Sequence, residues 1–190
     1  MIYSNTYPKD WTEEQRVAAE KALSKEEIAK LRQEWETPPD FWAAVDRIFQ
    51  FQKDVCGTEV NKKCVRVMTP ELNSLREHCM WVGDLAERVW CNPGFSDVLP
   101  WHQKAHEESN CHPSCVVVVI GIPGASQEWY RFAQAHADEI IDLSPRVHFL
   151  APWPLKQSSN NRESMLFVYR RKVVPTRPAT RTLWRWKGEE

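Results

Sequence analysis

Five consecutive β-branched residues, Val116 to Ile120, restrict the fold of this chain more than any other feature. Side chains of a strand point alternately to its two faces, so a strand without a polar residue must be covered on both. Strands of this kind lie inside a sheet that has helices on each side. We therefore predict an α/β layered fold with a mostly parallel sheet.

The remaining sequence alternates between strand-like and helix-like segments, as this fold requires. Further strands are predicted at 51–56, 88–91, 140–143, 147–150 and 164–169, and helices at 13–23, 25–35, 38–49, 70–79, 96–109 and 126–138. Thr12 and Ser24 each stand three residues before a Gln or Glu, which is the capping-box pattern of a helix start. Thr37, followed by two prolines, is the predicted cap of the third helix.

The length of 190 residues suits one domain with an appendage. Two polar helices in residues 1–34 form the predicted N-terminal appendage, residues 35–172 the main domain, and residues 173–190 a basic tail that contains tryptophans. The net charge is −1, so no overall field draws the chain to nucleic acid. The basic tail has two open interpretations: it contacts phosphates, or it is a solvated, partly disordered terminus.

The sequence also argues against several classes of protein. It shows neither a signal peptide nor an apolar run of membrane-spanning length, so we expect a soluble, cytoplasmic protein with no membrane partner and reduced cysteines. His102 and His106 stand four residues apart on a predicted helix, and Cys111 and Cys115 follow, but this spacing matches no common zinc module. We therefore predict no metal site.

The loop after the predicted strand at 88–91 holds the most informative motif of the chain, Asn92-Pro93-Gly94-Phe95. Ligands of parallel sheets bind beyond the carboxyl ends of the strands, and this loop lies at such an end. Asn-Pro-Gly is also common turn chemistry, so the motif by itself leaves a simple turn as the alternative. An amide, a backbone carbonyl and an aromatic face in one loop favour a binding site.

Seven short motifs occur in order between residues 35 and 171. They are Trp35–Pro39, Phe51–Gly57, Asn61 to Glu71, Leu75 with Trp81, Val89–Pro93, Trp101 with Lys104, and Pro145–Phe149. Together they make this stretch resemble the phage-type DNA N6-adenine methyltransferases, the Dam-like family. The resemblance implies a Rossmann-like methyltransferase sheet with flanking helices, an S-adenosylmethionine cofactor and double-stranded DNA as the partner.

The resemblance also implies roles for single residues. Asn92 and Pro93 would accept hydrogen bonds from the N6 amino group of a flipped adenine, and Phe95 would stack on the base. The cofactor would be held by Thr37, Pro38, Asp54, Cys56 and Asn73. Contacts to nucleic acid would come from Arg146, Arg170, Arg171 and Lys172.

Two positions depart from the family pattern. Gly94 replaces the second proline of the Asn-Pro-Pro-aromatic motif, which removes a restraint on φ and costs about 0.4–1 kcal/mol of backbone entropy. Asn73 stands where the family often has an aspartate. The predicted function is adenine-N6 methylation of DNA, and the alternative is a catalytically impaired relative that serves as a DNA- or protein-binding module.

Overall fold

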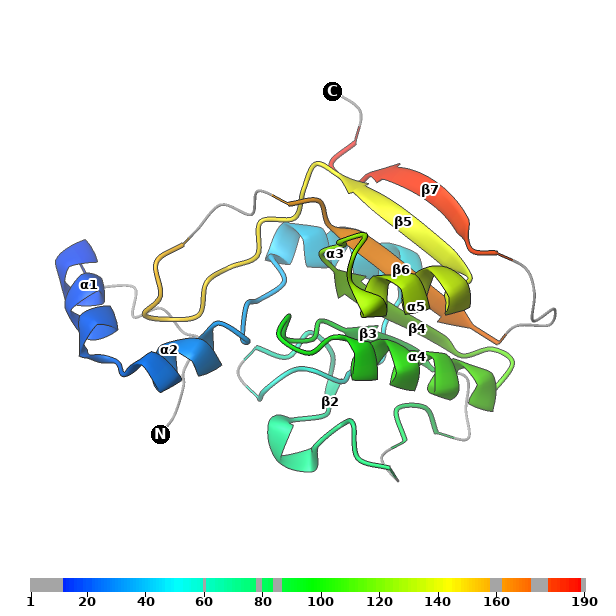
Figure 1. Ribbon diagram of the computed structural model, residues 1–190, viewed down its shortest axis with the longest axis horizontal. Coiled ribbons are helices and arrows are strands. Elements are labelled where there is room, and N and C mark those ends of the chain that lie inside the picture. Colours follow the sequence, from blue (N-terminus) through cyan, green and yellow to red (C-terminus); the bar gives the residue numbers. More distant parts are fainter. Residues whose placement is uncertain are drawn as a thin grey trace.

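A computed structural model provides the structure of the chain and describes residues 12–59, 61–77, 80–83, 87–157, 162–171 and 178–188. Lys172, one of the predicted contacts to nucleic acid, lies outside these ranges. The described residues form a layered α/β fold around one sheet (Figure 1). None of the described helices is long and apolar enough to cross a membrane.

The sheet has seven strands in the order β2-β1-β3-β4-β6-β5-β7. They are β1 (Lys53–Asp54), β2 (Arg66–Val67), β3 (Arg88–Cys91), β4 (Val116–Gly121), β5 (Glu139–Ser144), β6 (Met165–Arg170) and β7 (Thr180–Arg185). Neighbouring strands are parallel except at β6, which runs antiparallel to β4 and β5. The predicted α/β class is therefore confirmed, and the carboxyl ends of all strands except β6 share one edge of the sheet.

Helices cover both faces of this sheet. They are α1 (Glu13–Ala22), α2 (Lys25–Leu31), α3 (Pro39–Phe49), α4 (Leu99–Cys111) and α5 (Glu128–His136), with a short 3-10 turn, η1 (Pro70–Leu72). Val117 and Val119 of β4 pack in the core layer beneath α4 and α5, while Val118 and Ile120 pack in the layer with α3. The run of β-branched residues is therefore buried on both faces, as predicted.

The two predicted capping boxes are confirmed at the starts of α1 and α2. The Thr12 hydroxyl accepts a hydrogen bond from the Gln15 amide, and the Ser24 hydroxyl accepts one from the Glu27 amide. In both cases the side chain of the third helical residue accepts from the cap amide in return. These local bonds fix where each helix begins without help from the sheet.

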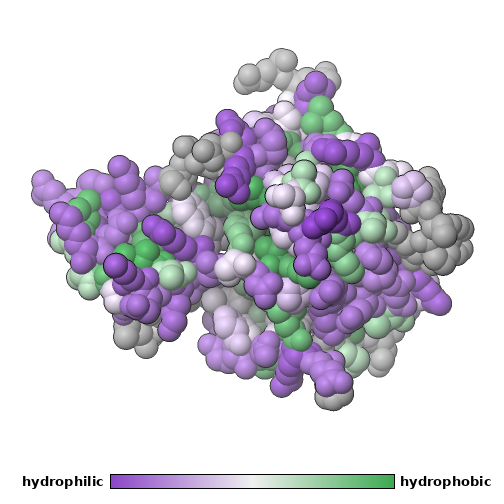
Figure 2. Space-filling model, in the orientation of Figure 1, coloured by the Kyte–Doolittle hydropathy of each residue, from purple (hydrophilic) through white to green (hydrophobic). Residues whose placement is uncertain are grey.

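α1 and α2 pack against the loop that follows β5 and stand to one side of the sheet (Figure 1). Leu31, at the end of α2, is buried against Ala151 and Leu155. The Arg16 guanidinium of α1 donates to the Pro154 carbonyl at 2.8 Å. Figure 2 shows apolar side chains where these helices meet the loop, and a second apolar area over the middle of the body. The appendage is therefore docked on the main domain.

The start of α3 differs from the prediction. Pro38 occupies the N-cap position, the first helical residue is Pro39, and no side chain caps the helix. A residue before proline is held extended, so Pro38 cannot be helical and Thr37 lies one residue too far out. The Thr37 hydroxyl instead lies 3.4 Å from the Asn92 side-chain nitrogen.

Two other predicted elements are wrong. Residues 147–150 form no strand, because only Leu150 pairs with another segment, in an isolated bridge to Glu36. The alternation in this segment reflects burial, since every second side chain enters the core. The helix predicted at 70–79 is limited to the turn η1, which ends at Asn73 in a left-handed conformation (φ 48°).

The sheet also contains two strands that were not predicted, β2 and β7. β6 corresponds to the predicted last strand, but β7 follows it, pairs in parallel with β5 and forms an edge of the sheet. Trp186, directly after β7, packs edge-on against Phe41 of α3 with 5.0 Å between the ring centroids. Residues 180–186 are therefore ordered as a strand and the turn after it, although most of their side chains are exposed, so only the expectation of disorder is wrong for this segment.

Candidate active site

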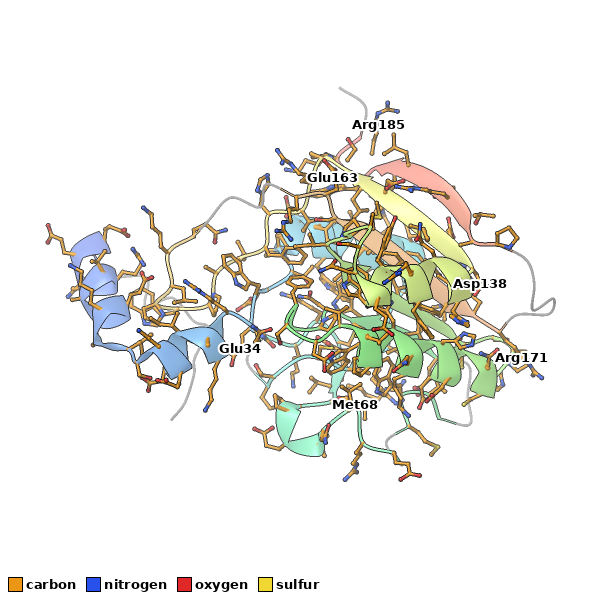
Figure 3. All side chains as sticks on the ribbon, in the orientation of Figure 1. Glu34, Met68, Asp138, Glu163, Arg171 and Arg185 are labelled. Atoms are coloured by element: carbon orange, nitrogen blue, oxygen red, sulfur yellow. The ribbon has the colours of Figure 1, made fainter. Side chains whose placement is uncertain are left out.

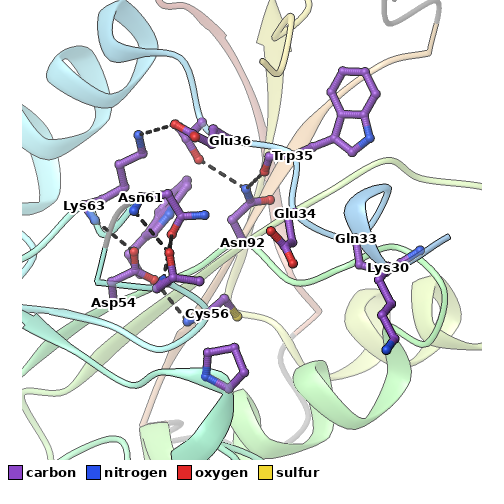
Figure 4. A pocket seen from close by; sticks show the side chains of 15 residues that line it. Lys30, Gln33, Glu34, Trp35, Glu36, Asp54, Cys56, Asn61, Lys63 and Asn92 are labelled. Carbon is purple, nitrogen blue, oxygen red and sulfur yellow. Dashed lines mark hydrogen bonds and ion pairs between the residues drawn. The ribbon is translucent and has the colours of Figure 1, made fainter. Parts of the chain in front are cut away.

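Two adjoining cavities lie at the carboxyl ends of β1 and β3. The larger, of about 330 Å³, is lined by several charged and polar residues, which include Glu36, Asp54, Asn61 and Lys63 (Figure 4). The smaller, of about 280 Å³, is lined by residues that include Val55, Met68, Pro70 and Trp101. Four residues line both cavities: Gln33, Cys56, Pro70 and Asn92. The predicted cofactor loop and the predicted catalytic loop therefore meet at one place.

Asn92 follows β3 directly and lies between the two cavities. Its Nδ2 donates to the Trp35 carbonyl at 2.9 Å and lies near the Thr37 hydroxyl (Figure 4). A carbonyl oxygen can only accept a hydrogen bond, so this contact fixes the orientation of the amide. The opposite end, Oδ1, is buried and has no hydrogen-bond partner among the described residues. Asn92 therefore lines the junction of the cavities and holds an oriented, unpaired acceptor beside it.

Asp54, at the end of β1, shapes the loop that lines the larger cavity. Its carboxylate is buried and accepts hydrogen bonds from the amides of Cys56 and Lys63, each at 3.0 Å. Burial raises the pKa of Asp54, and these backbone N–H groups oppose that rise. A Cβ at Gly57 would lie 2.7 Å from Asp54 Oδ2, so only glycine fits there. Asp54 holds the loop in place, and its direct contact with a cofactor stays a prediction.

Cys56 and Cys91 are free thiols whose sulfur atoms lie 3.3 Å apart. Cys91 is the last residue of β3, so this contact joins the predicted cofactor loop to the start of the Asn92 loop. Burial raises the pKa of the Cys56 thiol well above its ordinary value, and the neighbouring Cys91 raises it further. Cys56 is therefore a neutral thiol and contributes packing at the cavity wall, not charge.

A chain of buried hydrogen bonds supports the smaller cavity. The Ser74 hydroxyl donates to the Val55 carbonyl at 2.7 Å, and the Trp81 indole donates to the Ser74 carbonyl at 2.8 Å. The Glu108 carboxylate of α4 accepts from the Trp81 backbone amide at 3.0 Å. Asn73, a predicted cofactor ligand, lines this cavity and keeps an exposed side chain. The network therefore fixes the rim and leaves Asn73 accessible.

Pro93 and Phe95 complete the predicted catalytic motif. Pro93 is buried, and its carbonyl accepts no hydrogen bond from the part of the chain that the structure describes. Phe95 is half-buried and packs edge-on against Phe149, with 5.8 Å between the ring centroids. Phe149 belongs to the predicted motif after β5. Two motifs far apart in the sequence therefore meet beside Asn92.

Sequence reasoning assigned no role to Gln33 and Glu34, which line the larger cavity from the end of α2 (Figure 4). The Gln33 side-chain oxygen accepts a hydrogen bond from the Ser96 amide at 3.1 Å. Burial raises the pKa of Glu34. Both residues lie in the predicted appendage, and their place directly before the Trp35 motif is the signal that could have identified them.

The basic residues predicted to contact nucleic acid are divided between two edges of the sheet. Arg146 is exposed and follows β5, so it lies at the edge that holds the cavities. Arg170 ends the antiparallel β6 and lies with Arg171 at the opposite edge, where an acidic residue of β5 pairs with Arg170 at 3.5 Å. Arg185, which was not in the predicted set, ends β7 on the side of Arg146 and far from Arg171 (Figure 3).

His102 is a buried core residue that lies between α4, α5 and the sheet. Its Nδ1 lies 2.7 Å from the Tyr169 hydroxyl, and its ring stacks on Trp129 at 5.0 Å between centroids. Burial lowers the pKa of His102 to about 3, so the ring is neutral. Across the described residues, no group of three or more His, Cys, Asp or Glu side chains is placed to hold a metal ion.

The strand order and the loops at the carboxyl edge define a Rossmann-like methyltransferase domain. A sequence model of the DNA N-6-adenine-methyltransferase (Dam) family matches residues 24–182, and the chain therefore belongs to this family. The chain is also similar to the DNA N-6-adenine-methyltransferase of Haemophilus phage HP1 (strain HP1c1), with 29% identity over 143 residues, which cover 73% of this chain and 79% of that protein.

These comparisons confirm the family resemblance found in the sequence and the predicted function as a DNA adenine-N6 methyltransferase. Neither comparison supports the alternative of a catalytically impaired binding module. The matched segment begins at residue 24 and so includes α2 but not α1. The end of the appendage that lines the larger cavity is therefore part of the family domain.

Proposed function

We propose that Asn92 Oδ1 and the Pro93 carbonyl accept the two hydrogens of the N6 amino group of a target adenine. The observation that carries this proposal is the buried Asn92 Oδ1, which Trp35 orients and which lacks a partner among the described residues. A buried acceptor without a donor is costly, and a ligand N–H removes that cost. Hydrogen bonds accepted from the amine draw its lone pair out of the ring and make it more nucleophilic.

Phe95 supports the same base through its ring. The adenine must leave the duplex to reach a loop at the edge of the sheet, and a base that has lost its neighbours gains from a new aromatic partner. Stacking of a base on an aromatic side chain contributes about 1–3 kcal/mol. Phe149 holds the Phe95 ring edge-on, so the ring is positioned before the base arrives.

The two cavities are proposed to hold S-adenosylmethionine, which supplies a methyl group on a sulfonium when bound. The lining fits such an elongated ligand. Glu36 and Lys63, with 3.9 Å between their charged atoms, suit an amino-acid end with both charges. Met68 and Trp101 suit a nucleoside. A volume of about 330 Å³ for the larger cavity alone is in the usual range of ligand sites.

Four of the five predicted cofactor residues line the two cavities. Thr37 forms part of the wall of the larger cavity next to Asn92, and Asp54 holds the loop that faces it. Pro38 lines neither cavity and occupies the N-cap position of α3, directly after Thr37. Cys56 lies at the junction of the cavities and Asn73 at the rim of the smaller. The methylated nitrogen loses its extra proton after transfer, so the reaction requires no side chain with a specially adjusted pKa.

The proposed partner is double-stranded DNA bound across the carboxyl edge of the sheet. Arg146 and Arg185 are exposed at this edge and provide positive charge for phosphates. The electrostatic part of the DNA-binding free energy comes from cations that face the same stretch of DNA backbone as the flipped base. Arg170 and Arg171 lie at the other edge and have no part in this arrangement.

The experiment is methylation of DNA of mixed sequence by Asn92→Ala, with radioactive S-adenosylmethionine and base analysis. Loss of an acceptor that acts on the reacting group should lower kcat by about 10²- to 10³-fold. Affinity for S-adenosylmethionine, measured by calorimetry, should stay near that of the unmodified chain. Asn110→Ala, at an exposed amide on α4, is the matched control. Undiminished methylation by Asn92→Ala would overturn the proposed role.

A further inference from the structure

Gln33 connects the N-terminal helices to the catalytic loop. It follows α2, and its amide donates to the Lys30 carbonyl at 2.9 Å, which continues the last helical turn. Its side-chain oxygen accepts from the Ser96 amide at 3.1 Å. Two residues later, the Trp35 carbonyl accepts from Asn92. The segment 33–35 therefore holds the loop 92–96 at its first and last residues.

The space beside Gly94 is occupied by the same glutamine. The φ of Gly94 lies outside the left-handed range, so its backbone conformation does not require glycine. A Cβ at this position would lie 3.0 Å from the Gln33 Cβ and 3.3 Å from the Gln33 carbonyl oxygen, and neither atom can rotate away. A proline at position 94, as in the family pattern, would meet these atoms. Gln33 and a second proline therefore compete for the same space, and one of them must shift by a few tenths of an ångström if both are present.

We propose that Gln33 is a positioning residue for methyl transfer and restrains the Asn92 loop in place of the missing second proline. The inference rests on the proposed roles of Asn92 and Phe95. Proline would stiffen the loop from within by fixing φ. Gln33 restrains it from outside, through one hydrogen bond and through packing on Gly94. The restraint is anchored because Leu31, two residues earlier, is buried in the core cluster of α2.

Loss of the acceptor tests the restraint directly. In Gln33→Ala, kcat should fall about three- to tenfold, as for loss of one exposed hydrogen bond together with its packing on Gly94, and affinity for S-adenosylmethionine should change less than kcat. Hydrogen exchange of the peptide that contains Ser96 should become faster in the protein without ligand. Gln33→Glu keeps an oxygen that accepts from Ser96 and should retain most of the activity. Arg32→Ala is the control for a surface change on the same turn.

A reciprocal pair of variants tests the competition between Gln33 and proline. Gly94→Pro alone should lower kcat because the ring meets Gln33, and Gln33→Gly alone should lower it because the restraint is lost. The double variant regains a restraint from proline in the space that Gln33 leaves. It should therefore be more active than either single variant.

The outcomes separate this inference from the proposed function. If the unmodified chain does not methylate adenine in DNA, the proposed function fails, and hydrogen exchange at Ser96 still decides whether Gln33 restrains the loop. If the unmodified chain is active and the Gln33 variants match it in kcat and in exchange, the inference is wrong and the proposed function stands. A double variant no better than Gly94→Pro would also contradict this competition.

Discussion

Asn92 and His102 each bury a polar atom that has no hydrogen-bond partner among the described residues. The two atoms differ in whether a ligand can reach their surroundings. Asn92 Oδ1 lies at the junction of two cavities, where a ligand can supply a donor. His102 Nε2 lies in the packed core, where Trp129 and Phe167 surround the ring. We therefore expect Asn92 Oδ1 to bind a ligand, whereas His102 Nε2 is a fixed cost of the core.

The lowered pKa of the buried His102 predicts how the free energy of unfolding depends on pH. Above its ordinary pKa of 6.5 the imidazole is neutral in the folded and the unfolded chain, and it contributes no pH dependence. Between 6.5 and about 3 only the unfolded chain takes up the proton, so stability falls as the pH falls through this range. The contribution of His102 to the free energy of unfolding should fall by up to about 1.4 kcal/mol for each pH unit below 6.5. Urea unfolding at pH 7.5 and at pH 5.5 measures this change.

His102→Phe removes the proton site and keeps a ring against Trp129. The variant should lose stability at pH 7.5, because the Tyr169 hydroxyl lacks a partner, but lose less between pH 7.5 and 5.5 than the unmodified chain. His148→Gln, at an exposed position, is the control. Equal pH dependence in His102→Phe and the unmodified chain would contradict the assignment.

At the residue scale, the sequence was sufficient to predict groups that are fixed by a short motif. Asn92 and Phe95 could be proposed from the sequence because the motif follows a strand and belongs to an ordered series. Gln33 was not found, because its role depends on packing against Gly94 from a distant part of the sequence, and no local pattern encodes it. Thr37 was interpreted as a cap because local chemistry permits that role, but the following prolines move the helix start away.

α2 and α1 differ in how much the site depends on them. α2 leads into the segment that contacts Asn92 and Ser96 and lies within the family match, whereas α1 lies outside it. α1 meets the body through the hydrogen bond between Arg16 and Pro154 and through Leu23, at its C-cap, which packs against the cluster of Leu31, Ala151 and Leu155. The catalytic loop should therefore tolerate the loss of α1 but not the loss of α2 packing.

Two variants test this difference between the helices. A chain that begins at residue 24 should keep a kcat near that of the full chain. Leu31→Ala in the full chain should lower both the stability of the α2 contact and the kcat, since Leu→Ala in a packed core costs about 2–5 kcal/mol. Melting and methylation assays on both variants decide this. A shortened chain that is folded but inactive would contradict the division.

A helix or strand could be predicted well from the sequence when the residues that determine it lie within the element itself. The capping boxes of α1 and α2 and the apolar run of β4 contain their own evidence, so their positions were predicted closely. β1 and β2 are two residues long and exist because they pair with neighbours. The alternation at 147–150 gave the correct buried side chains but not a strand, because periodicity reports burial and not backbone pairing.

At the scale of the whole molecule, the direction of β6 decides which cations can serve the site. β6 is antiparallel to both of its neighbours, so its end, with Arg170 and Arg171, faces away from the cavities. Arg185 ends β7 and Arg146 follows β5, and both of these strands are parallel to β3. The two arginines therefore lie at the same edge of the sheet as Asn92. This arrangement could not be read from the sequence, in which Arg170 and Arg185 belong to one basic segment.

Salt dependence of DNA binding distinguishes the two edges. Arg146→Ala with Arg185→Ala should weaken binding to a duplex and reduce the slope of log K against log salt by about 0.9 for each phosphate that the variant no longer neutralises. Arg171→Ala, at the opposite edge, should leave the slope unchanged. Fluorescence anisotropy over a range of salt concentrations measures all three chains. A slope that changes only in Arg171→Ala would place the DNA on the other side of the molecule.

β7 has a consequence for the solubility of shortened forms of the chain. A chain that stops after β6 lacks the strand that covers one side of β5. The backbone N–H and C=O groups of β5 would then face solvent as an open template, and a second copy could add a strand to it. The core would also lose Trp186, which packs on Phe41. Such a chain should aggregate, so residues that read as a basic tail protect the enzyme from self-association.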